Sequence, residues 1–148
     1  MMSIVELTFL SKEQVADLLL LMRELSARTK VDADMLMRVA QSPSSHLFAI
    51  MEKDGHIIGT ASLCIFDSPT GRKAHIEDVV VLSSYRGQGL GKRLMGHLID
   101  YARGELAPVD LYLTSKPSRV AANGLYRALG FSPKETNVYK MTIDSKEI

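Results

Sequence analysis

The sequence predicts an α/β (α+β) fold in which a mixed central sheet carries helices on both faces. Three observations lead to this prediction: an element order of roughly β-α-α-β-β-β-α-β-α-β-β, a hairpin signal near its middle, and one strand that is apolar on both faces. The 148 residues are 46% hydrophobic and 24% charged, which is typical of a globular protein. We therefore expect residues 1–148 to form a single domain.

The N-terminal part is predicted to be a strand followed by two helices. Loose alternation of apolar and polar residues favours a strand within Met2–Leu10. Ser11 followed by Gln14 resembles a capping box, after which apolar residues recur at helical spacing. A second helix is expected over Asp32–Gln41, ending before Pro43 because a residue that precedes proline avoids the helical conformation.

The middle of the chain is predicted to be a hairpin and a buried strand. The apolar runs Leu47–Met51 and Ile57–Phe66 are separated by a stretch containing Asp54 and Gly55. Asp-Gly favours a type I′ turn, in which both central residues have positive φ. Lys73–Leu82 is the next strand, and its apolar residues on both faces place it in the middle of a covered sheet.

The C-terminal part is predicted to alternate between helices and strands. A helix is expected to end near Gly104, and a short strand follows over Val109–Thr114. The next helix is expected over Ser118–Leu129, with a glycine after it as the C-cap. Phe131 and the stretch Asn137–Ile143 are then expected to close the sheet.

The stretch YRGQGLGK, Tyr85–Lys92, indicates a phosphate-binding turn. A Walker loop would need glycine where Arg86 stands and a hydroxyl residue where Arg93 stands. A dinucleotide fingerprint would need its third glycine one position after Gly91, and it would follow the first strand of its unit. The pattern Arg-x-x-Gly-x-Gly fits better, since it follows a buried strand and opens a helix. There, backbone N–H groups and the helix N-terminus can hold an anion. A tight turn that binds nothing is the alternative.

Two motifs together resemble those of the GNAT-superfamily N-acetyltransferases. The first is Arg86-x-x-Gly89-x-Gly91, and the second is AANGLYRALGF, Ala121–Phe131. With the element order, the resemblance covers the chain from Leu47 to Lys140. It implies the acyl-CoA N-acyltransferase fold, which has a mostly antiparallel sheet and a splay between strands 4 and 5. It also implies acetyl-CoA as cosubstrate, with the pantetheine arm lying in that splay like an added strand.

The resemblance assigns acetyl-CoA contacts to three parts of the chain. These are the backbone of the buried strand, the N–H groups of the glycine-rich loop around the diphosphate, and one asparagine side chain beside the pantetheine arm. The residues so assigned are Val79, Val80, Val81, Arg86, Gly87, Gln88, Gly89, Leu90, Gly91, Lys92 and Asn123.

Acetyl transfer to an amine needs a group that accepts a proton. A primary alkylamine has a pKa near 10.4, so only about one molecule in 10³ is neutral at pH 7. The resemblance implies a carboxylate nine residues before the motif's first basic residue, and Glu77 holds that place before Arg86. We expect Glu77 to be the base, directly or through water, and Asp78 to bind substrate. His75 is a secondary candidate for the base. The alternative is that both carboxylates are ordinary charges at a strand end.

The departing thiolate of CoA needs a proton or a hydrogen bond. Tyr126 stands where the resemblance places a tyrosine that supplies it. The alternative is that Tyr126 is a core aromatic residue. An acetyl-enzyme is not expected, because Cys64 is the only cysteine and falls in a strand away from both motifs. Direct attack in a ternary complex is therefore expected, with the developing oxyanion held by a strand backbone N–H, that of Val79.

Composition argues against several other classes of function. The formal net charge of +1 gives no general attraction to nucleic acid or to an anionic membrane. The single cysteine allows no intrachain disulfide and no zinc site of cysteine pairs, and the four histidines show no metal-ligand spacing. No secretory signal or long apolar segment is visible, so we expect a cytoplasmic protein without metal.

The acceptor is expected to be a primary amine of a small molecule. His75 to Val81 and the following loop resemble glucosamine-6-phosphate N-acetyltransferases locally, and Lys116 and Arg119 are candidate cations for a phosphorylated acceptor. Two alternatives remain open, namely a protein lysine or N-terminal acetyltransferase and a non-catalytic acyl-CoA-binding module. The resemblance also suggests a homodimer through the C-terminal strands.

Overall fold

The structure, a computed structural model, describes residues 2–146. Up to Thr114 the residues form one compact unit, and from Ser115 onward they form a second. The single domain over residues 1–148 therefore stays a prediction.

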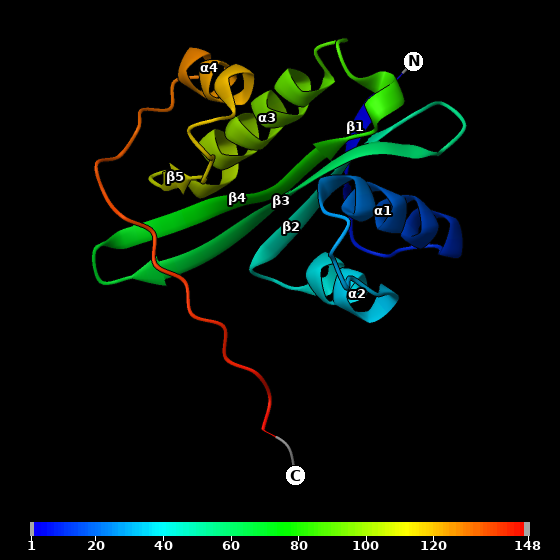
Figure 1. Cartoon of the computed structure of the whole chain (residues 1–148), viewed down its shortest axis with the longest axis horizontal. Coiled ribbons are helices and arrows are strands. Elements are labelled where there is room, and N and C mark those ends of the chain that lie inside the picture. Colours follow the sequence, from blue (N-terminus) through cyan, green and yellow to red (C-terminus); the bar gives the residue numbers. More distant parts are fainter. Residues whose placement is uncertain (1, 147–148) are drawn as a thin grey trace. The chain divides into compact units, whose positions relative to one another are not determined.

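The first unit contains a five-stranded sheet with the strand order β1-β2-β3-β4-β5 (Figure 1). The strands β1 to β4 pair antiparallel with their neighbours, whereas β5 runs parallel to β4. This confirms the expected mixed, mostly antiparallel sheet. The strands are β1 (Ser3–Leu7), β2 (Ser45–Met51), β3 (Ile57–Ser68), β4 (Gly71–Val81) and β5 (Asp110–Tyr112).

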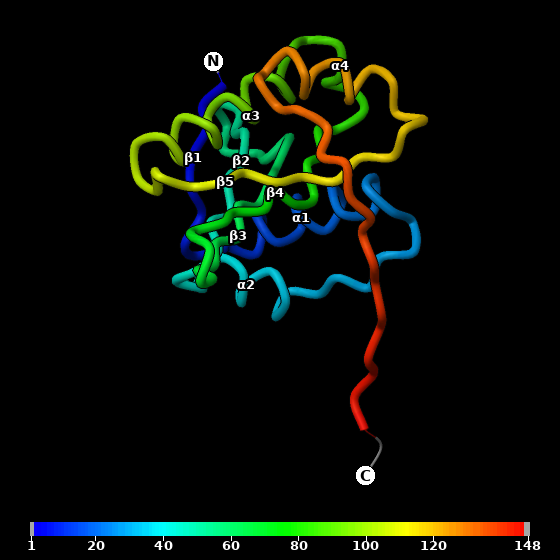
Figure 2. Tube along the Cα trace, turned by 90° about the vertical axis from the view of Figure 1, so that its left-hand side faces the viewer, coloured from blue at the N-terminus to red at the C-terminus, as the bar shows by residue number. Residues whose placement is uncertain are grey.

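Helices cover both faces of this sheet, as expected. In two views of the first unit, α1 and α2 lie on one side of the strands and α3 lies on the other (Figures 1 and 2). The 3₁₀ turn η1 leads into the glycine-rich loop, and the π-helical turn η2 continues α3 toward β5. The elements are α1 (Lys12–Leu25), α2 (Ala33–Gln41), η1 (Ser83–Tyr85), α3 (Leu90–Tyr101) and η2 (Ala102–Leu106).

The predicted helix starts are confirmed at the level of single hydrogen bonds. The hydroxyl of Ser11 accepts from the N–H of Gln14 at 3.1 Å, and the side chain of Gln14 accepts from the N–H of Ser11 at 3.0 Å. Asp32 caps α2 through a bond from the N–H of Met35 at 2.9 Å. These caps satisfy N–H groups that the first helical turn cannot bond, so they define where each helix begins.

Alternation along β2 separates two hydrophobic cores. Leu47 and Ala49 are buried in a cluster with residues of α1 and α2 such as Leu21. Phe48 points to the other face, where its ring contacts His97 of α3 edge-on at 5.3 Å between centroids. Because successive strand residues face opposite ways, one strand contributes to both cores and holds the three helices in place around the sheet.

The hairpin between β2 and β3 forms, but its turn is not type I′. Gly55 has φ 92°, whereas Asp54 is not among the residues with positive φ. The N–H of Gly55 donates to the carbonyl of Glu52 at 2.9 Å, and the N–H of Glu52 donates to the carbonyl of His56 at 2.9 Å. This is a longer loop in which only the glycine is left-handed, so the extra residues relieve Asp54 of a strained conformation.

The second unit contains the helix α4 (Val120–Ala128), which ends before Gly130 at φ 105° as expected. The expected closing strands at Phe131 and Asn137–Ile143 are wrong, since the described residues after α4 form no strand. The large apolar side chains of this stretch are exposed, Tyr139 by 89%. Alternation favours a strand locally, but a strand also needs a neighbour for its backbone groups, and sequence periodicity does not supply one.

Among the described residues, no helix combines the length and the apolar composition that crossing a membrane requires.

Candidate functional site

The glycine-rich loop leaves the N-terminus of α3 open. Gly87 and Gly89 have φ of 84° and 74°, a conformation that glycine adopts at little cost. Gly89 is the N-cap, and no side chain among the described residues caps this end or adds an acidic group to its first turn. The first N–H groups of a helix have no carbonyl partner within the helix, so they remain directed at whatever anion approaches.

The loop also offers physical room. A Cβ added to Gly87, Gly89 or Gly91 would meet no atom within 4 Å. Gly91 has no positive φ, so the fold of the chain does not itself require a glycine there. Leu90, 4% exposed, anchors the start of α3 in the core, while Lys92 is exposed. The geometry fits close approach of a diphosphate to the backbone with a cation beside it.

The side chain of Arg86 contacts two other segments of the first unit. Its Nε donates to the carbonyl of Val81 at 3.1 Å, and its Nη2 lies 3.6 Å from Oε2 of Glu24 on α1. The guanidinium therefore joins three segments of the first unit. In this arrangement Arg86 shapes the loop, rather than acting only as the nearby positive charge that the sequence predicts.

The edge of β4 beyond β5 fits an added strand-like ligand. The pairing of β4 with β5 ends at His75 and Tyr112, although β4 continues to Val81. The N–H of Leu82 donates to the carbonyl of Ile58 on β3 at 2.8 Å. Alternate residues of an antiparallel strand turn their peptide groups to opposite neighbours, so the N–H of Val81 is directed away from β3. This is the splay expected between strands 4 and 5.

A β-bulge interrupts β4 where the catalytic carboxylates are expected. The register against β3 shifts between Thr60 and Ser62, and Asp78 has φ 54°. Aspartate tolerates this left-handed conformation better than most residues. Bulges of this kind redirect side chains and often lie beside active sites. Val79 follows directly in the bulge, so the simple alternation does not apply to its backbone, and its assigned contact stays a prediction.

Glu77 lies on the open part of the sheet face that α1 and α2 cover elsewhere. It pairs with Ser62, which also pairs with Leu47 of the α1–α2 core. His75 pairs with Cys64, two positions along on the same face. Directly paired residues point the same way, and both Glu77 and Asp78 are exposed. The side chain of Glu77 is therefore accessible from this face, and its role as a base stays a prediction.

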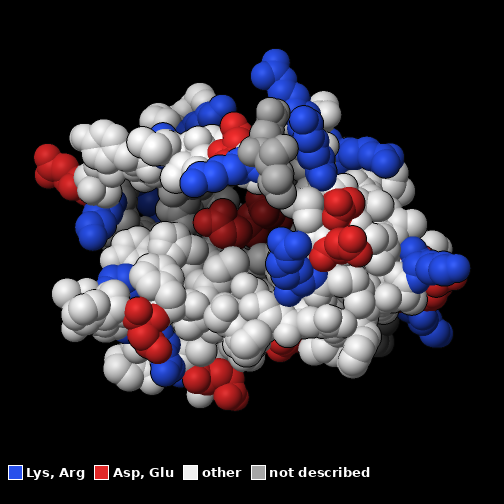
Figure 3. Space-filling view, turned by 90° about the horizontal axis from the view of Figure 1, so that it is seen from below, with Lys and Arg blue, Asp and Glu red and all other residues white. Residues whose placement is uncertain are grey.

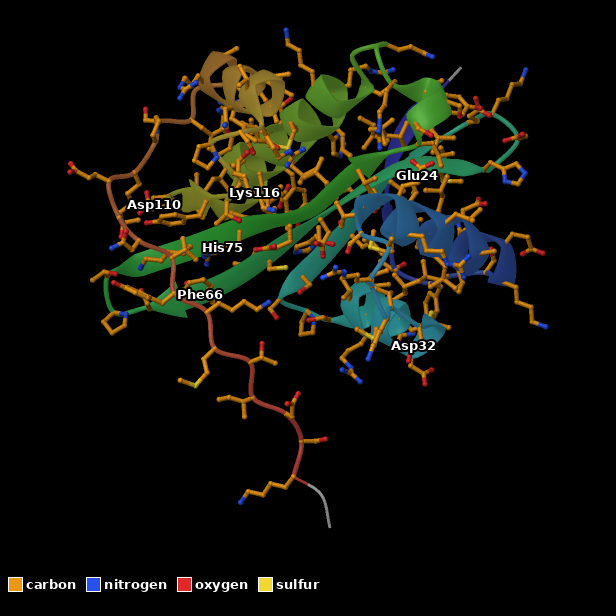
Figure 4. All side chains as sticks on the ribbon, viewed as in Figure 1. Glu24, Asp32, Phe66, His75, Asp110 and Lys116 are labelled. Atoms are coloured by element: carbon orange, nitrogen blue, oxygen red, sulfur yellow. The ribbon has the colours of Figure 1, made fainter. Side chains whose placement is uncertain are left out.

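His75 stands in a row of rings. Its imidazole stacks on Phe66 at 5.7 Å and on Tyr112 at 5.3 Å between ring centroids. Figure 4 shows Phe66 and His75 on neighbouring strands at one end of the sheet. This packing orients the imidazole between two aromatic neighbours, and its use as a secondary base stays a prediction.

The single cysteine is closer to the expected site than the sequence suggests. Cys64 pairs with His75 and shares a face with Glu77, although neither of these residues belongs to the two motifs from which Cys64 is expected to be distant. Burial raises the pKa of the Cys64 thiol, and the charges of Glu77 and Asp78 raise it further. A raised pKa keeps the sulfur protonated, so proximity does not make it a good nucleophile.

Asn123 and Tyr126 both lie in the second unit, on α4. The amide nitrogen of Asn123 donates to the carbonyl of Lys116 at 3.0 Å, which ties the preceding loop to the helix. The carbonyl oxygen of this side chain takes no part in that bond. The ring of Tyr126 packs edge-on against Phe131 at 6.3 Å between centroids. The contacts expected of both residues with CoA stay predictions.

The face shown in Figure 3 carries charged side chains of both signs, and some of its acidic side chains gather near the centre of the view. The formal net charge of the chain is only +1. Any binding of a charged ligand therefore depends on local groups such as the α3 N-terminus.

Comparison with known proteins adds independent information. The sequence model of the acetyltransferase (GNAT) family matches residues 13–131. A glucosamine 6-phosphate N-acetyltransferase of Trypanosoma brucei brucei is 42% identical over 84 residues, which are 55% of this chain and 54% of that protein. N-alpha-acetyltransferase RimI of Mycobacterium tuberculosis is 30% identical over 94 residues, which are 64% of this chain and 56% of that protein.

The match to these two curated relatives spans only a little over half of their length. A solved structure, an acetyltransferase of Trypanosoma brucei, resembles the whole chain with a TM-score of 0.71 and 28% identity. This similarity covers 97% of this chain and 99% of that one.

Proposed function

Because the chain belongs to the acetyltransferase (GNAT) family, we propose that it transfers the acetyl group of acetyl-CoA to a primary amine of a small molecule. The family match confirms the resemblance that the motifs around Arg86 and Ala121–Phe131 indicate. The local similarity to glucosamine-6-phosphate N-acetyltransferases is confirmed as well, by a relative that carries that name.

One observation carries the proposal more than any other. The uncapped N-terminus of α3 and its open glycine loop come just after the part of β4 that pairs with β3 on one side but, among the described residues, with no strand on the β5 side. CoA has a diphosphate suited to the first feature and an extended pantetheine arm with amide groups suited to the second. In this proposal the N–H groups of Gly87 to Lys92 hold the diphosphate, and the backbone of Val79 to Val81 receives the arm.

Glu77 is the proposed base. The acceptor amine must lose a proton before or during attack on the thioester carbonyl, and an exposed carboxylate on β4 can take it directly or through water. The nitrogen forms a bond to the acetyl carbon, the carbon–sulfur bond breaks, and CoA departs as a thiolate. Tyr126 is proposed to protonate that thiolate, and Asn123 to contact the pantetheine arm.

Direct attack is preferred to an acetyl-enzyme. Cys64 shares the face of Glu77, but the pKa of its thiol is raised by burial and by neighbouring carboxylates. A thiol in that environment has little thiolate to accept an acetyl group. We therefore expect Cys64→Ala to retain acetyl transfer, and loss of all turnover in this variant would argue for a covalent intermediate.

Protein N-terminal acetylation is the second candidate. It is favoured by the 30% identity to N-alpha-acetyltransferase RimI, whose name specifies an α-amine acceptor. The small-molecule acceptor is preferred because the glucosamine 6-phosphate relative is 42% identical over a region of similar length. A cytoplasmic location and a homodimer are part of the same proposal.

The proposal is tested in two steps. Calorimetry with CoA first establishes whether the cofactor binds. Release of CoA from acetyl-CoA is then measured with a panel of amines that includes glucosamine 6-phosphate and a peptide with an unblocked N-terminus. We expect turnover with at least one small amine, and a preference for the peptide would support the second candidate.

Variants of the β4 carboxylates separate catalysis from binding alone. Glu77→Gln is expected to lower kcat by roughly 10²–10⁴, because a positioned base contributes about that much. Asp78→Asn, which retains a residue tolerant of positive φ, is expected to raise KM for the amine instead. If the wild-type protein binds CoA but turns over no amine of the panel, a non-catalytic acyl-CoA-binding module is favoured.

A further inference from the structure

The carboxylate of Glu24 binds the turn that precedes the glycine-rich loop. Its Oε2 accepts from the N–H of Ser83 at 2.9 Å, and its Oε1 accepts from the hydroxyl of Ser83 at 3.0 Å. The same Oε2 lies 3.6 Å from Nη2 of Arg86. One side chain from the end of α1 thus contacts both ends of a four-residue segment, Ser83 to Arg86 (Figure 4 labels Glu24).

These contacts are not explained by the stability of α1 itself. Glu24 is the second-last residue of α1, which ends at Leu25. The C-terminus of a helix carries a partial negative charge, so an acidic residue in the last turn is unfavourable for the helix. The contacts with Ser83 and Arg86 must offset that effect, which indicates that Glu24 serves the segment after β4 rather than its own helix.

The same turn is held from a second direction. A hydrogen bond to the Glu52 side chain raises the pKa of Tyr85, the last residue of η1. Glu52 is the first residue of the loop between β2 and β3, so η1 contacts α1 at Ser83 and the hairpin at Tyr85. Gly87 and Gly89, which follow, have no side chain with which to make such an anchor, and both adopt positive φ, so their position depends on η1.

We propose that Glu24 is a positioning residue for the diphosphate of CoA. It holds Ser83 to Arg86 in the conformation that presents the N–H groups of the glycine loop together. The inference rests on the proposed function and deepens it, since it assigns a residue outside both motifs to cofactor binding.

A glycine-rich loop needs such an anchor for a physical reason. Glycine loses more conformational freedom on ordering than any other residue, so binding of a ligand to an unanchored loop would include that entropy loss. If the N–H donors are already held in place, the entropy is lost on folding and does not reduce the affinity. Removing Glu24 should therefore lower the affinity for any ligand that contacts the loop. The affinity for a ligand that contacts only other parts of the site should stay the same.

The experiment measures the affinity of three probes for Glu24→Ala and for wild type by calorimetry. CoA carries the diphosphate and the arm, ADP carries a diphosphate alone, and pantetheine carries the arm alone. We expect the Kd of CoA and ADP to rise about tenfold, as lost hydrogen bonds to a charged group imply, and the Kd of pantetheine to stay within about twofold. Glu24→Gln, which keeps the shape and one acceptor, should give a smaller rise.

Asp17→Ala is the matched control. Asp17 lies on the same helix, and its carboxylate also accepts from a backbone N–H, that of Ile57 at 3.0 Å, and contacts His56. It anchors α1 to the hairpin rather than to η1. A comparable loss of stability is expected in this variant, with CoA, ADP and pantetheine affinities all unchanged.

A double-mutant cycle sharpens the assignment. Ser83→Ala removes only the hydroxyl bond to Oε1 and keeps the N–H bond and the Arg86 contact, so it should weaken ADP less than Glu24→Ala does. The double variant should be no weaker than Glu24→Ala, because the hydroxyl bond is already lost in that variant. Equal weakening of all three probes, or of none, would overturn the inference and leave Glu24 as a residue of general stability. Absence of CoA binding by the wild-type protein would instead refute the proposed function, so the two failures are distinguishable.

Discussion

Single residues of the glycine loop differ in what the chain requires of them. Gly87 and Gly89 adopt positive φ, so other residues there would strain the backbone. Gly91 lies in the first turn of α3 without positive φ, and an added Cβ would meet nothing within 4 Å. Because the fold itself does not require glycine at position 91, we infer that a ligand approaches the backbone there.

Gly91→Ala is therefore expected to change stability and binding in opposite directions. Alanine is favoured over glycine in a helix by roughly 0.5–1 kcal/mol, so the free energy of unfolding should rise by up to that amount. The new methyl group stands where the diphosphate approaches, so the Kd for CoA should rise about tenfold or more. Urea unfolding and calorimetry measure the two effects.

Gly96→Ala supplies the control for this prediction. Gly96 lies in the same helix, and an added Cβ there also meets nothing within 4 Å. Its substitution should stabilise the helix by a similar amount and leave CoA affinity unchanged. If Gly91→Ala also left the affinity unchanged, the diphosphate would not lie against the start of α3.

The bulge residue Asp78 gives a second prediction at this scale. Its φ of 54° costs most residues about 1–2 kcal/mol, and β-branched residues more than aspartate or asparagine. Asp78→Val should therefore lower the free energy of unfolding by about that amount, whereas Asp78→Asn should lie within about 0.5 kcal/mol of wild type. Urea unfolding of both variants checks this, and equal stability would mean that the bulge relaxes without cost.

Among the elements, α1 connects the hairpin to the loop after β4. Asp17 contacts His56 at 3.2 Å and the N–H of Ile57, while Glu24 contacts Ser83. The apolar side of α1 thus packs into the core, while the carboxylates of Asp17 and Glu24 hydrogen-bond to the hairpin and to the segment after β4. This arrangement ties the position of the glycine loop to the sheet face on which Glu77 lies.

The hairpin contact makes stability depend on pH. The hydrogen bond and the charge of Asp17 raise the pKa of His56 above its ordinary 6.5. The folded state therefore binds the proton more tightly than the unfolded state. The resulting stabilisation is fully present below the unfolded pKa of 6.5 and is lost as pH rises through the folded pKa.

We therefore expect His56→Gln to be less stable than wild type at about pH 5.5 and equally stable at about pH 9. Urea unfolding at both values measures the difference. Asp17→Ala should be destabilised at both values, because the bond to the N–H of Ile57 does not titrate with the imidazole. A His56→Gln deficit that persisted at the higher pH would show that packing, not charge, is lost.

The elements that the sequence predicts are those with local causes. The capping box of Ser11 and Gln14 and the glycine after Asp54 act within a few residues, so periodicity and turn chemistry locate them. The closing strand at Asn137–Ile143 fails because pairing is not local. The bulge at Asp78 escapes prediction for the same reason, since it is defined by the register against β3.

In the candidate site, too, the residues that are contiguous in the sequence are predicted, and those that meet across long separations are not. The loop from Arg86 to Gly91 is visible in the sequence because its glycines and its helix start are contiguous. Glu24 is invisible, since it meets Ser83 across 59 positions of the chain. The one available sign is an acidic residue in the last turn of a predicted helix, where it opposes the helix dipole.

For the whole molecule, the open matter is whether both units unfold together. The residues assigned to CoA come from the first unit and, with Asn123 and Tyr126, from the second. If one domain spans residues 1–148, heating should give one cooperative transition with equal calorimetric and van't Hoff enthalpies. Bound CoA should raise the midpoint temperature Tm of that single transition.

The size of this shift follows from mass action. At about 100 times its Kd, a ligand that binds only the folded state adds about 2.7 kcal/mol to the free energy of unfolding. For a chain of this length that corresponds to roughly 5–10 °C in Tm. Two transitions, of which CoA raises only one, would contradict the single domain, and the fragment of residues 1–114 would then bind CoA without Asn123 and Tyr126.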